Sequence, residues 1–309
     1  MQRFAAAVVT AFAFVAPALP QTSPHAKNNP FIGRWDFDIQ STSGVGANWL
    51  GVSEKSGHLE VWFQPTGGHV HEVTDFRLNG SHLSLNPSPG LTWELDAANG
   101  RLTGTQKRGD KSVPLEGVRA PELNRPAPKA WSNPEPLFNG RNLDGWEPIG
   151  DPSKSHWIVE DGLLVNKEHG ANLRTTKSFS DFRLHFEVNC PDRANSGFYL
   201  RGRYELQLEY EVEGTEPPNR GMGSIYGRIA PSRELPRKPG QWETFDVTLV
   251  GRTLTVARDG VTIIDRKEIE GITGGALDAD EGKPGPFYIQ GDHTGGLKFR
   301  NITVATPKP

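Results

Sequence analysis

The 309-residue sequence has a single cysteine, Cys190, and no apolar run long enough to cross a membrane. One cysteine cannot close an intramolecular disulfide, so a disulfide framework is excluded and Cys190 is expected to be a buried, inert thiol. The most apolar stretch, Phe4 to Val15, is too short to span a bilayer. The sequence therefore predicts no membrane span.

The first twenty residues have the pattern of a secretory signal instead. Arg3 supplies the positive end, the apolar run follows, and Ala16 and Ala18 offer small residues for cleavage. No cysteine follows the run to accept a lipid. We expect residues 1–20 to be a signal peptide and the mature protein to be periplasmic or secreted, with a membrane anchor as the less favoured alternative.

The sequence also lacks an excess of charge of one sign, because it has 34 Lys and Arg and 37 Asp and Glu. No basic run is present that could neutralise a phosphate backbone, so nucleic acid is not expected as a partner. The chain contains 35 Gly and 25 Pro, which argue against long helices. Its 309 residues are more than a single hydrophobic core usually accommodates. We expect an all-β protein with two domains.

The first domain, residues 30–118, is predicted to be a small antiparallel β-barrel-like domain. Asn79-Gly80 and Asn99-Gly100 are strong hairpin signals, because both residues of a type I′ turn need positive φ. The motif Gly33–Phe37 resembles the first strand of lipocalin-like barrels. The short alternating segments are 33–40, 58–64, 69–78, 82–85, 91–96 and 100–106.

Two patterns in the chain suggest metal ligands only weakly. His69 and His71 share one face of a predicted strand, but no third ligand is evident, and exposed histidines explain the pair better. The segment Asp278–Gly282 lacks the full ligand pattern of a calcium loop and is expected to be a solvated acidic turn.

Five prolines between positions 121 and 136 predict a stiff, extended linker over residues 119–136. Beyond it, residues 137–305 contain alternating segments joined by Gly, Pro and Asp-Gly turns, among them Asp161-Gly162, which favour a two-sheet sandwich. The segments are 182–188, 197–200, 204–210, 243–250, 253–258, 261–265, 287–290 and 297–304.

A series of short motifs in the second domain carries a family resemblance. The motifs are Leu-Phe-Asn-Gly at 137–140, Leu-Asp-Gly-Trp at 143–146, Asn-Ser-Gly at 195–197, Tyr-Glu-Leu-Gln at 204–207, Ile-Tyr-Gly at 225–227, Gly-Gln-Trp at 240–242, Gln-Gly-Asp-His at 290–293 and Phe-Arg-Asn-Ile at 299–302. In this order they resemble the 3-keto-disaccharide hydrolase domain family (3-keto-glucoside 1,2-lyase or 3-keto-2-hydroxy-glucal hydratase) from about Leu137 to Val304. The sequence departs from the family's usual pattern at Glu209, where Asp is common, and at Trp242-Glu243, where Trp-Asn is common.

This resemblance implies a concanavalin-like jelly-roll sandwich that cleaves glycosides already oxidised to a ketone at C3. The ketone acidifies the C2 proton, so a base can remove it, the enolate can expel the C1 oxygen, and water can add afterwards. The expected partner is thus an oxidised, 3-keto sugar. The rival interpretations are a non-catalytic, lectin-like carbohydrate-binding module and an interaction protein that docks to a partner.

Glu205 and His293 are the predicted catalytic residues. Glu205, Gln207 and Glu209 alternate with apolar residues and share one face of a strand, although an exposed outer face would show the same alternation. His293 titrates near neutral pH, and the adjacent Asp292 can fix its tautomer, although a loop-capping role is the alternative.

Substrate binding is assigned to polar and aromatic side chains of the same motifs. A surface salt bridge is the alternative for Arg201, turn formation for Asn195, and core packing for Tyr226. No cofactor is predicted, with a divalent cation on Glu205, Asp292 and His293 as the open alternative. The assigned residues are Gln207, Arg201, Asn195, Tyr226 and Asp292.

Overall fold

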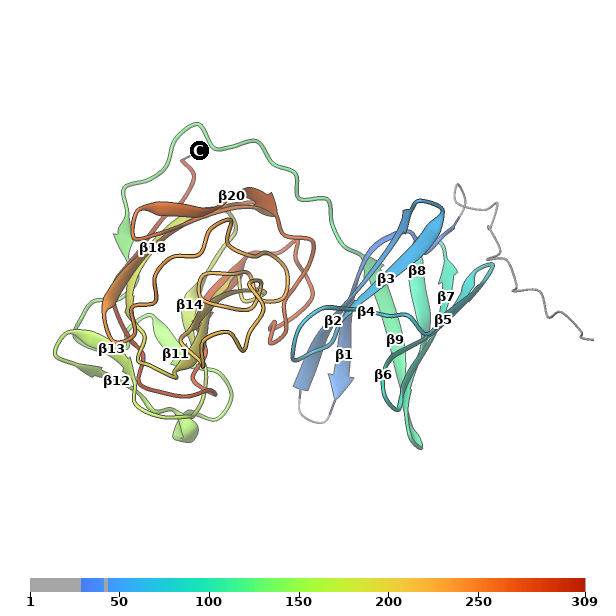
Figure 1. The fold of residues 1–309 in the computed structure, drawn as a ribbon, viewed down its shortest axis with the longest axis horizontal. Coiled ribbons are helices and arrows are strands. Elements are labelled where there is room, and N and C mark those ends of the chain that lie inside the picture. Colours follow the sequence, from blue (N-terminus) through green and yellow to red (C-terminus); the bar gives the residue numbers. More distant parts are fainter. Residues whose placement is uncertain (1–28, 42–43, 309) are drawn as a thin grey trace, which may run out of the picture.

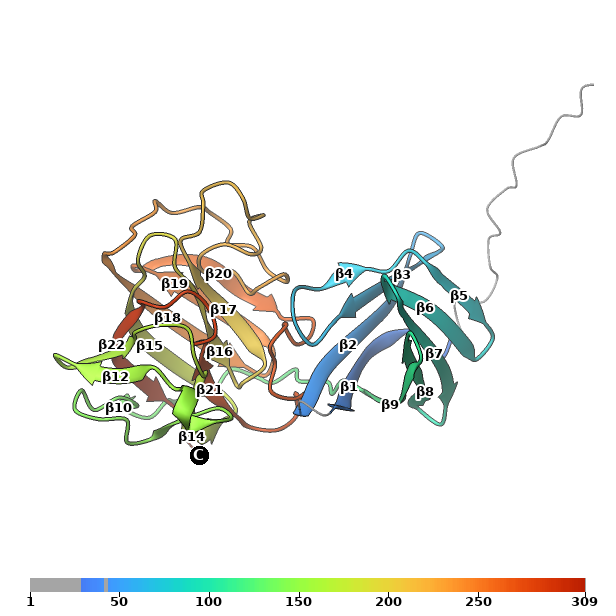
Figure 2. The same cartoon turned by 90° about the horizontal axis from the view of Figure 1, so that it is seen from below.

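The computed structural model describes residues 29–41 and 44–308, which form two β-rich domains side by side (Figures 1 and 2). The predicted signal peptide lies outside these residues. Across the described ranges, no helix combines the length and apolar character needed to cross a bilayer. The all-β prediction is confirmed, since strands build both domains and the 3-10 helix η2 (Pro152–Lys154) is a single turn.

The N-terminal domain is one curled antiparallel sheet made of consecutive hairpins. β1 lies in its middle, because it pairs with β2 on one side and β9 on the other. Inward-facing aromatic residues fill its core, where Phe37 and Phe63 both pack edge-on against Trp93. In the described residues the sheet order is β4-β3-β2-β1-β9-β8-β7-β6-β5, with β1 (Gly33–Ser41), β2 (Gly44–Lys55), β3 (His58–Gln64), β4 (His71–Glu72), β5 (Phe76–Asn79), β6 (His82–Ser88), β7 (Leu91–Ala98), β8 (Arg101–Arg108) and β9 (Lys111–Arg119).

Both predicted hairpins of this domain are present, but one turn and one strand differ from the prediction. At Asn79-Gly80 only Gly80 has a positive φ, of 60°, because the pairing of Asn79 with His82 places the turn at Gly80-Ser81. Asn99 and Gly100 have φ of 51° and 73° between β7 and β8, as a type I′ turn requires. The predicted strand 69–78 is two short strands, because the chain turns inward between them to bury Val73, whose amide donates to the carbonyl of Val61. His69 therefore lies in a loop outside the strand. His71 bonds the carbonyl of Pro87, so the two histidines do not form a metal site together.

The second domain is a sandwich of two antiparallel sheets, which confirms the predicted fold. From Arg119 to Glu135 the chain runs along its surface as an extended segment (Figure 1). The larger sheet of the described residues has the order β12-β13-β22-β15-β18-β19-β20 with β10 paired to β22, and the smaller one the order β11-β14-β21-β16-β17. Their bounds are β10 (Glu135–Pro136), β11 (Trp146–Pro148), β12 (Trp157–Glu160), β13 (Leu163–Asn166), β14 (Leu173–Phe179), β15 (Phe182–Asn189), β16 (Asn195–Leu200), β17 (Tyr204–Glu209), β18 (Trp242–Val250), β19 (Thr253–Arg258), β20 (Val261–Glu268), β21 (Gly285–Ile289) and β22 (Lys298–Ala305).

The smaller sheet is buried on both of its faces. Its inner face packs Phe198, Leu206 and Leu208 into the core between the sheets. Because side chains alternate along a strand, the opposite face carries Glu205 and Gln207, which are only 4% and 3% exposed. Glu205 and Gln207 on this opposite face, called the polar face below, are therefore shielded from solvent by neighbouring parts of the chain.

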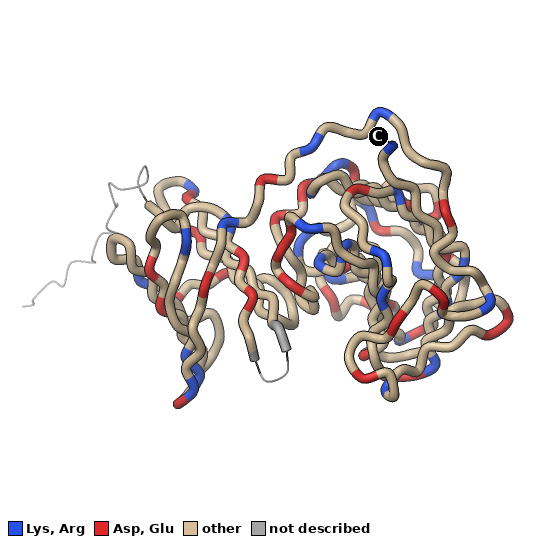
Figure 3. Tube along the Cα trace, turned by 180° about the vertical axis from the view of Figure 1, so that it is seen from behind, with Lys and Arg blue, Asp and Glu red and all other residues tan. Residues whose placement is uncertain are grey.

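The segment Ile272–Glu281 covers one end of the polar face and also contacts the N-terminal domain. Ile272, Ala276 and Ala279 pack with Trp49 of β2, and the amide of Ala279 donates to Asp38 of β1 at 2.7 Å. Glu281 at its end is fully buried and pairs with Arg252, so the predicted solvated acidic turn is wrong at this residue. Charges of both signs are intermingled along the rest of the trace (Figure 3).

Candidate functional site

Glu205 is the most unusual ionisable residue of the polar face. It lies on β17 opposite Tyr199 of β16, and Gly197 leaves room for its side chain, since a Cβ there would be 2.4 Å from Glu205 Oε1. Burial raises the pKa of Glu205 to about 8, more than the Tyr199 hydroxyl and His293 lower it. Burial therefore favours the protonated, neutral form of Glu205.

Hydrogen-bond counting around Tyr199 leads to the same protonation state. Its hydroxyl oxygen lies 2.8 Å from Glu205 Oε2 and 2.6 Å from the carbonyl oxygen of Gly274, and it accepts from Gln290 Nε2 at 3.1 Å. The hydroxyl has one proton for two acceptors, and the Gly274 carbonyl, which can only accept, is the nearer of the two. When the proton is directed at Gly274, Glu205 bonds to Tyr199 by donating to it, as a neutral carboxyl can.

His293 forms a hydrogen-bonded pair with Asp292 on the loop after β21. Its Nδ1 lies 2.9 Å from Asp292 Oδ1, and this bond raises the pKa of His293 above its usual value. Burial alone would raise the pKa of Asp292, but the bond and charge of His293 hold it below its ordinary range. Asn172 fixes the loop by accepting from the amides of Gly291 and Asp292 at 2.7 and 3.2 Å. With Nδ1–H directed at Asp292, Nε2 of neutral His293 is free to act as a base.

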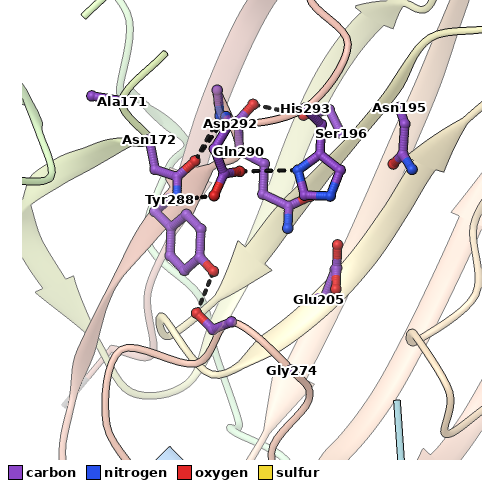
Figure 4. Close-up of polar contacts among 12 residues, drawn as sticks. Ala171, Asn172, Asn195, Ser196, Glu205, Gly274, Tyr288, Gln290, Asp292 and His293 are labelled. Carbon is purple, nitrogen blue, oxygen red and sulfur yellow. Dashed lines mark hydrogen bonds and ion pairs between the residues drawn. The ribbon is translucent and has the colours of Figure 1, made fainter. Parts of the chain in front are cut away.

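Amide side chains complete the polar face. Gln207 Nε2 donates to Asn195 Oδ1 at 3.2 Å, and Asn195 Nδ2 donates to Glu211 at 2.7 Å. The side-chain oxygens of Gln207 and Gln290 are buried and receive no hydrogen bond within the described residues. Such acceptors call for a donor, which a sugar hydroxyl can supply. Figure 4 shows His293, Gln290, Asn195 and Glu205 pointing toward a common space.

The structure brings together most, but not all, of the predicted site residues. Tyr226 is half-buried beside Glu205, its amide donating to the Glu205 carbonyl at 3.0 Å, and burial followed by the Glu205 charge raises the pKa of its hydroxyl. Arg201 is not brought to this group. It is 1% exposed in the turn after β16 and donates to Tyr204, whose ring belongs to the core between the sheets.

Sequence reasoning did not single out Tyr199, Gln290 or Asn172. Tyr199 was detectable, because it has the same parity as Asn195 on its strand, and Gln290 opens the motif that contains His293. Asn172 lies 120 residues from its partner Asp292, so no local pattern could indicate it. Among the described residues, no three His, Cys, Asp or Glu side chains are arranged to hold a metal ion.

A family profile matches the second domain of the chain. The profile of the 3-keto-alpha-glucoside-1,2-lyase-like domain matches residues 133–305. No curated protein matches the chain. Among solved structures, the chain is similar to a candidate glycosyl hydrolase from Parabacteroides distasonis, with 27% identity over 59% of this chain and 93% of that one and a TM-score of 0.48.

Two further solved structures resemble the chain more distantly. A second candidate glycosyl hydrolase from Parabacteroides distasonis is 19% identical over 56% of this chain and 93% of that one, with a TM-score of 0.45. The carbohydrate-binding module CBM66 from Bacillus subtilis is 13% identical over 55% of this chain and 99% of that one, with a TM-score of 0.36. Because the family profile covers more than half of the sequence, this chain belongs to the 3-keto-alpha-glucoside-1,2-lyase-like domain family of carbohydrate-active proteins.

Proposed function

We propose that the chain is an exported enzyme that cleaves 3-keto-glycosides by elimination and hydration, with His293 as the base and Glu205 as the acid. The observation that carries the proposal is the placement of a carboxyl and an imidazole on one polar face. A buried carboxyl with a raised pKa lies beside an imidazole whose Nδ1 bonds Asp292, which leaves Nε2 for the substrate and raises the pKa of the ring as well. The carboxyl in its protonated form is an acid, and the imidazole in its neutral form is a base.

The elimination can be written with these two residues alone. Nε2 of His293 removes the C2 proton, and the electrons of that bond form an enolate with the C3 carbonyl. The enolate re-forms the carbonyl, the C1–C2 double bond forms, and the C1–oxygen bond breaks. Glu205 gives its proton to the departing oxygen, which leaves as an alcohol.

The hydration step reverses the roles of the same two groups. Water adds to C1 of the unsaturated ketone while the Glu205 carboxylate takes a proton from it. Protonated His293 returns a proton to C2. Both residues are then back in their starting states, and the net reaction is hydrolysis to a 3-keto sugar and an alcohol.

The amide groups support a polyhydroxylated substrate. The unpaired oxygens of Gln207 and Gln290 would accept sugar hydroxyls, with Asn195 and Tyr226 beside them. A lectin-like platform of exposed aromatic rings is not favoured, because Tyr199 and Tyr288 on this face are each 1% exposed. The proposal therefore places an enzyme ahead of a binding module.

The test is to incubate the purified protein with a 3-keto-glucoside and with its unoxidised parent in deuterated water. We expect release of the alcohol from the ketone alone, with deuterium at C2 of the product above the level found in product incubated without protein. Glu205→Gln and His293→Ala should each slow release by about 10²–10⁴-fold. Sugar binding without release from any ketone would overturn the proposal in favour of a binding module.

A further inference from the structure

The loop Gln64–Val70 of the N-terminal domain contacts the segment that covers one end of the polar face. The carbonyl of Thr66 accepts from the amide of Gly275 at 2.7 Å. Gly68 packs so closely on Gly274 that a Cβ on Gly274 would lie 2.0 Å from the Gly68 carbonyl oxygen. His69 of the same loop faces Arg220 across the domain boundary, with 3.0 Å between Nδ1 and Nη1.

The contact with Gly275 acts on a peptide group that also serves the site. The amide N–H of Gly275 and the carbonyl of Gly274 belong to the same peptide plane, and the described residues contain no cis peptide bond. In a trans peptide these two groups point in opposite directions. The N–H is directed at Thr66, and the carbonyl is directed at the Tyr199 hydroxyl, 2.6 Å away.

We propose that the N-terminal domain is part of the active site, because a hydrogen-bond chain from Thr66 through the Gly274–Gly275 peptide and Tyr199 keeps Glu205 in its acid form. The contact with Thr66 holds the Gly274 carbonyl where it competes with Glu205 for the single proton of Tyr199. Gly275 N–H donates to Thr66, Tyr199 donates to Gly274, and Glu205 donates to Tyr199. Hydrogen bonds in such a chain polarise and strengthen one another. Thr66 and Tyr199 are thus positioning residues, and the role assigned to Glu205 as an acid rests on the proposed function.

The loop is built to hold the Thr66 carbonyl in place. Gln64 is fully buried, and its Nε2 donates to the carbonyls of Pro65 and Gly68 at 2.8 and 3.1 Å. Asn48 of β2 donates to the Thr66 hydroxyl at 3.1 Å and to the Gly46 carbonyl at 3.0 Å. Side chains from two strands of the N-terminal domain therefore fix the first member of the chain.

Other titratable groups influence the pKa of Glu205 without belonging to this hydrogen-bond chain. Those that face it from β16, β21 and the adjoining loops are Tyr199, Tyr288, Tyr226, Asp292 and His293. Only Tyr199 among them is hydrogen-bonded to the Glu205 carboxyl in the described residues. If the chain is broken, Tyr199 becomes free to turn its proton toward Glu205 and stabilise the carboxylate.

The test uses Gly274→Ala, which forces the loop away from the peptide group. Its matched control is Gly67→Ala, the same substitution in the facing loop, where a Cβ meets nothing within 4 Å. Glutamate labelled with ¹³C at Cδ reports the protonation of Glu205 directly by NMR, with the resonance assigned by its loss in Glu205→Gln. We expect the Glu205 titration midpoint to fall by about one unit or more in Gly274→Ala and to stay at its original value in Gly67→Ala.

A second pair of variants keeps the test valid if Gly274→Ala does not fold. Asn48→Ala combined with Gln64→Leu loosens the loop from within the N-terminal domain. Its control is Asn86→Ala, which also removes side-chain hydrogen bonds of that domain, to Asp75 and Thr92, away from the loop. The loosened loop should lower the midpoint and the control should not.

The outcomes separate this inference from the proposed function. If Gly274→Ala, or Asn48→Ala combined with Gln64→Leu, folds and leaves the Glu205 titration midpoint unchanged, the proposed hydrogen-bond chain is wrong. This holds even if the wild-type protein cleaves the ketone. A lowered midpoint supports the chain, even if no 3-keto-glycoside is cleaved, in which case only the proposed function fails. Where cleavage is observed, the basic limb of kcat/KM should move to lower pH together with the NMR midpoint.

Discussion

The sandwich carries two histidine–aspartate pairs of nearly identical geometry, one beside each outer face. His185 of β15 bonds Asp246 of β18 at 2.8 Å, and His293 bonds Asp292 at 2.9 Å. Their histidine side chains are similarly exposed, at 36% and 41%. What differs is the neighbourhood, because Glu205 and buried amides surround only the second pair among the residues described here. Pair geometry is therefore not what distinguishes the candidate site.

The comparison is tested most strongly by removing each histidine. His293→Ala and Glu205→Gln should each lower kcat/KM for a 3-keto-glycoside by about 10²–10⁴-fold, the range of general acid–base catalysis. His185→Ala should leave kcat/KM within twofold of wild type. Steady-state kinetics on the three folded variants decides this, and equal losses in His185→Ala and His293→Ala would contradict the assignment.

The buried pair Glu243–Arg258 and the exposed pair Asp246–His185, both with their acidic residue on β18, should differ in their contribution to stability. Glu243 is fully buried, accepts from Arg258 Nε and the Tyr210 hydroxyl at 2.6 Å each, and is one of the two departures from the family pattern. Glu243→Ala leaves Arg258 buried without its partner and should cost about 3–5 kcal/mol of unfolding free energy. Asp246→Ala should cost under about 1 kcal/mol. Urea unfolding of both variants measures the difference, and similar costs would show that burial is not the cause.

Substitution of Gly197, on the strand beside Glu205, fills the space next to the Glu205 side chain without removing any polar group. Gly197→Ala places a methyl group 2.4 Å from Glu205 Oε1, so the carboxyl must move. We expect kcat/KM to fall by about 10–100-fold with little change in secondary structure. Gly67→Ala is the control with open space around its Cβ. Wild-type kinetics in Gly197→Ala would mean that the position of Glu205 is not important for catalysis.

The raised pKa of Glu205 should also be visible in stability. The unfolded chain releases this proton near the ordinary value of 4.5, whereas the folded protein keeps it to about pH 8. The contribution of Glu205 to stability is therefore fully present below pH 4.5 and is lost as the pH rises toward 8. Glu205→Gln mimics the neutral acid and should be about 1–3 kcal/mol more stable than wild type at pH 8 and equal to it at pH 4. Thermal unfolding at the two pH values tests this, and an equal difference at both would exclude ionisation as the cause.

The smallest expected effect concerns the acid limb of the pH profile. His293 must be neutral to act as a base, and the bond to Asp292 raises its pKa. Asp292→Asn should move the acid limb of kcat/KM to lower pH by less than about one unit. Asp246→Asn, in the exposed pair, should not move it. A shift toward higher pH in Asp292→Asn would contradict the assignment of this limb to His293.

Local patterns were enough to predict many of the strands and several turns. β3 (His58–Gln64) and β19 (Thr253–Arg258) have the predicted bounds, and Asp161-Gly162 joins β12 to β13 as expected. β2 and β9 were not among the predicted segments, since glycines interrupt the alternation of one and Pro114 and Gly117 that of the other. Pairing across the sheet with β1, which lies between them, stabilises both strands despite their weak propensity.

The candidate site was predictable in its residues but not in its chemistry. Alternation along β17 placed Glu205 and Gln207 on one face, and the motif that begins at Gln290 supplied Asp292 and His293. Arg201 satisfied the same kind of pattern, yet it is buried with Tyr204 in the turn. The alternation of side chains between two faces holds within a strand and not in a turn. The direction of the Arg201 side chain therefore depends on packing.

The sequence by itself determined an all-β chain, its hairpins and the set of polar residues that share the polar face. These depend on neighbours one to three positions apart, which local sterics and alternation control. Only the tertiary structure decided that the pKa of Glu205 is raised. Its pKa depends on burial and on Tyr199, whose acceptor Gly274 is 75 residues away and is held by the N-terminal domain more than 200 residues upstream. Electrostatic energy depends on such distances in space and on the exclusion of water, neither of which a local pattern contains.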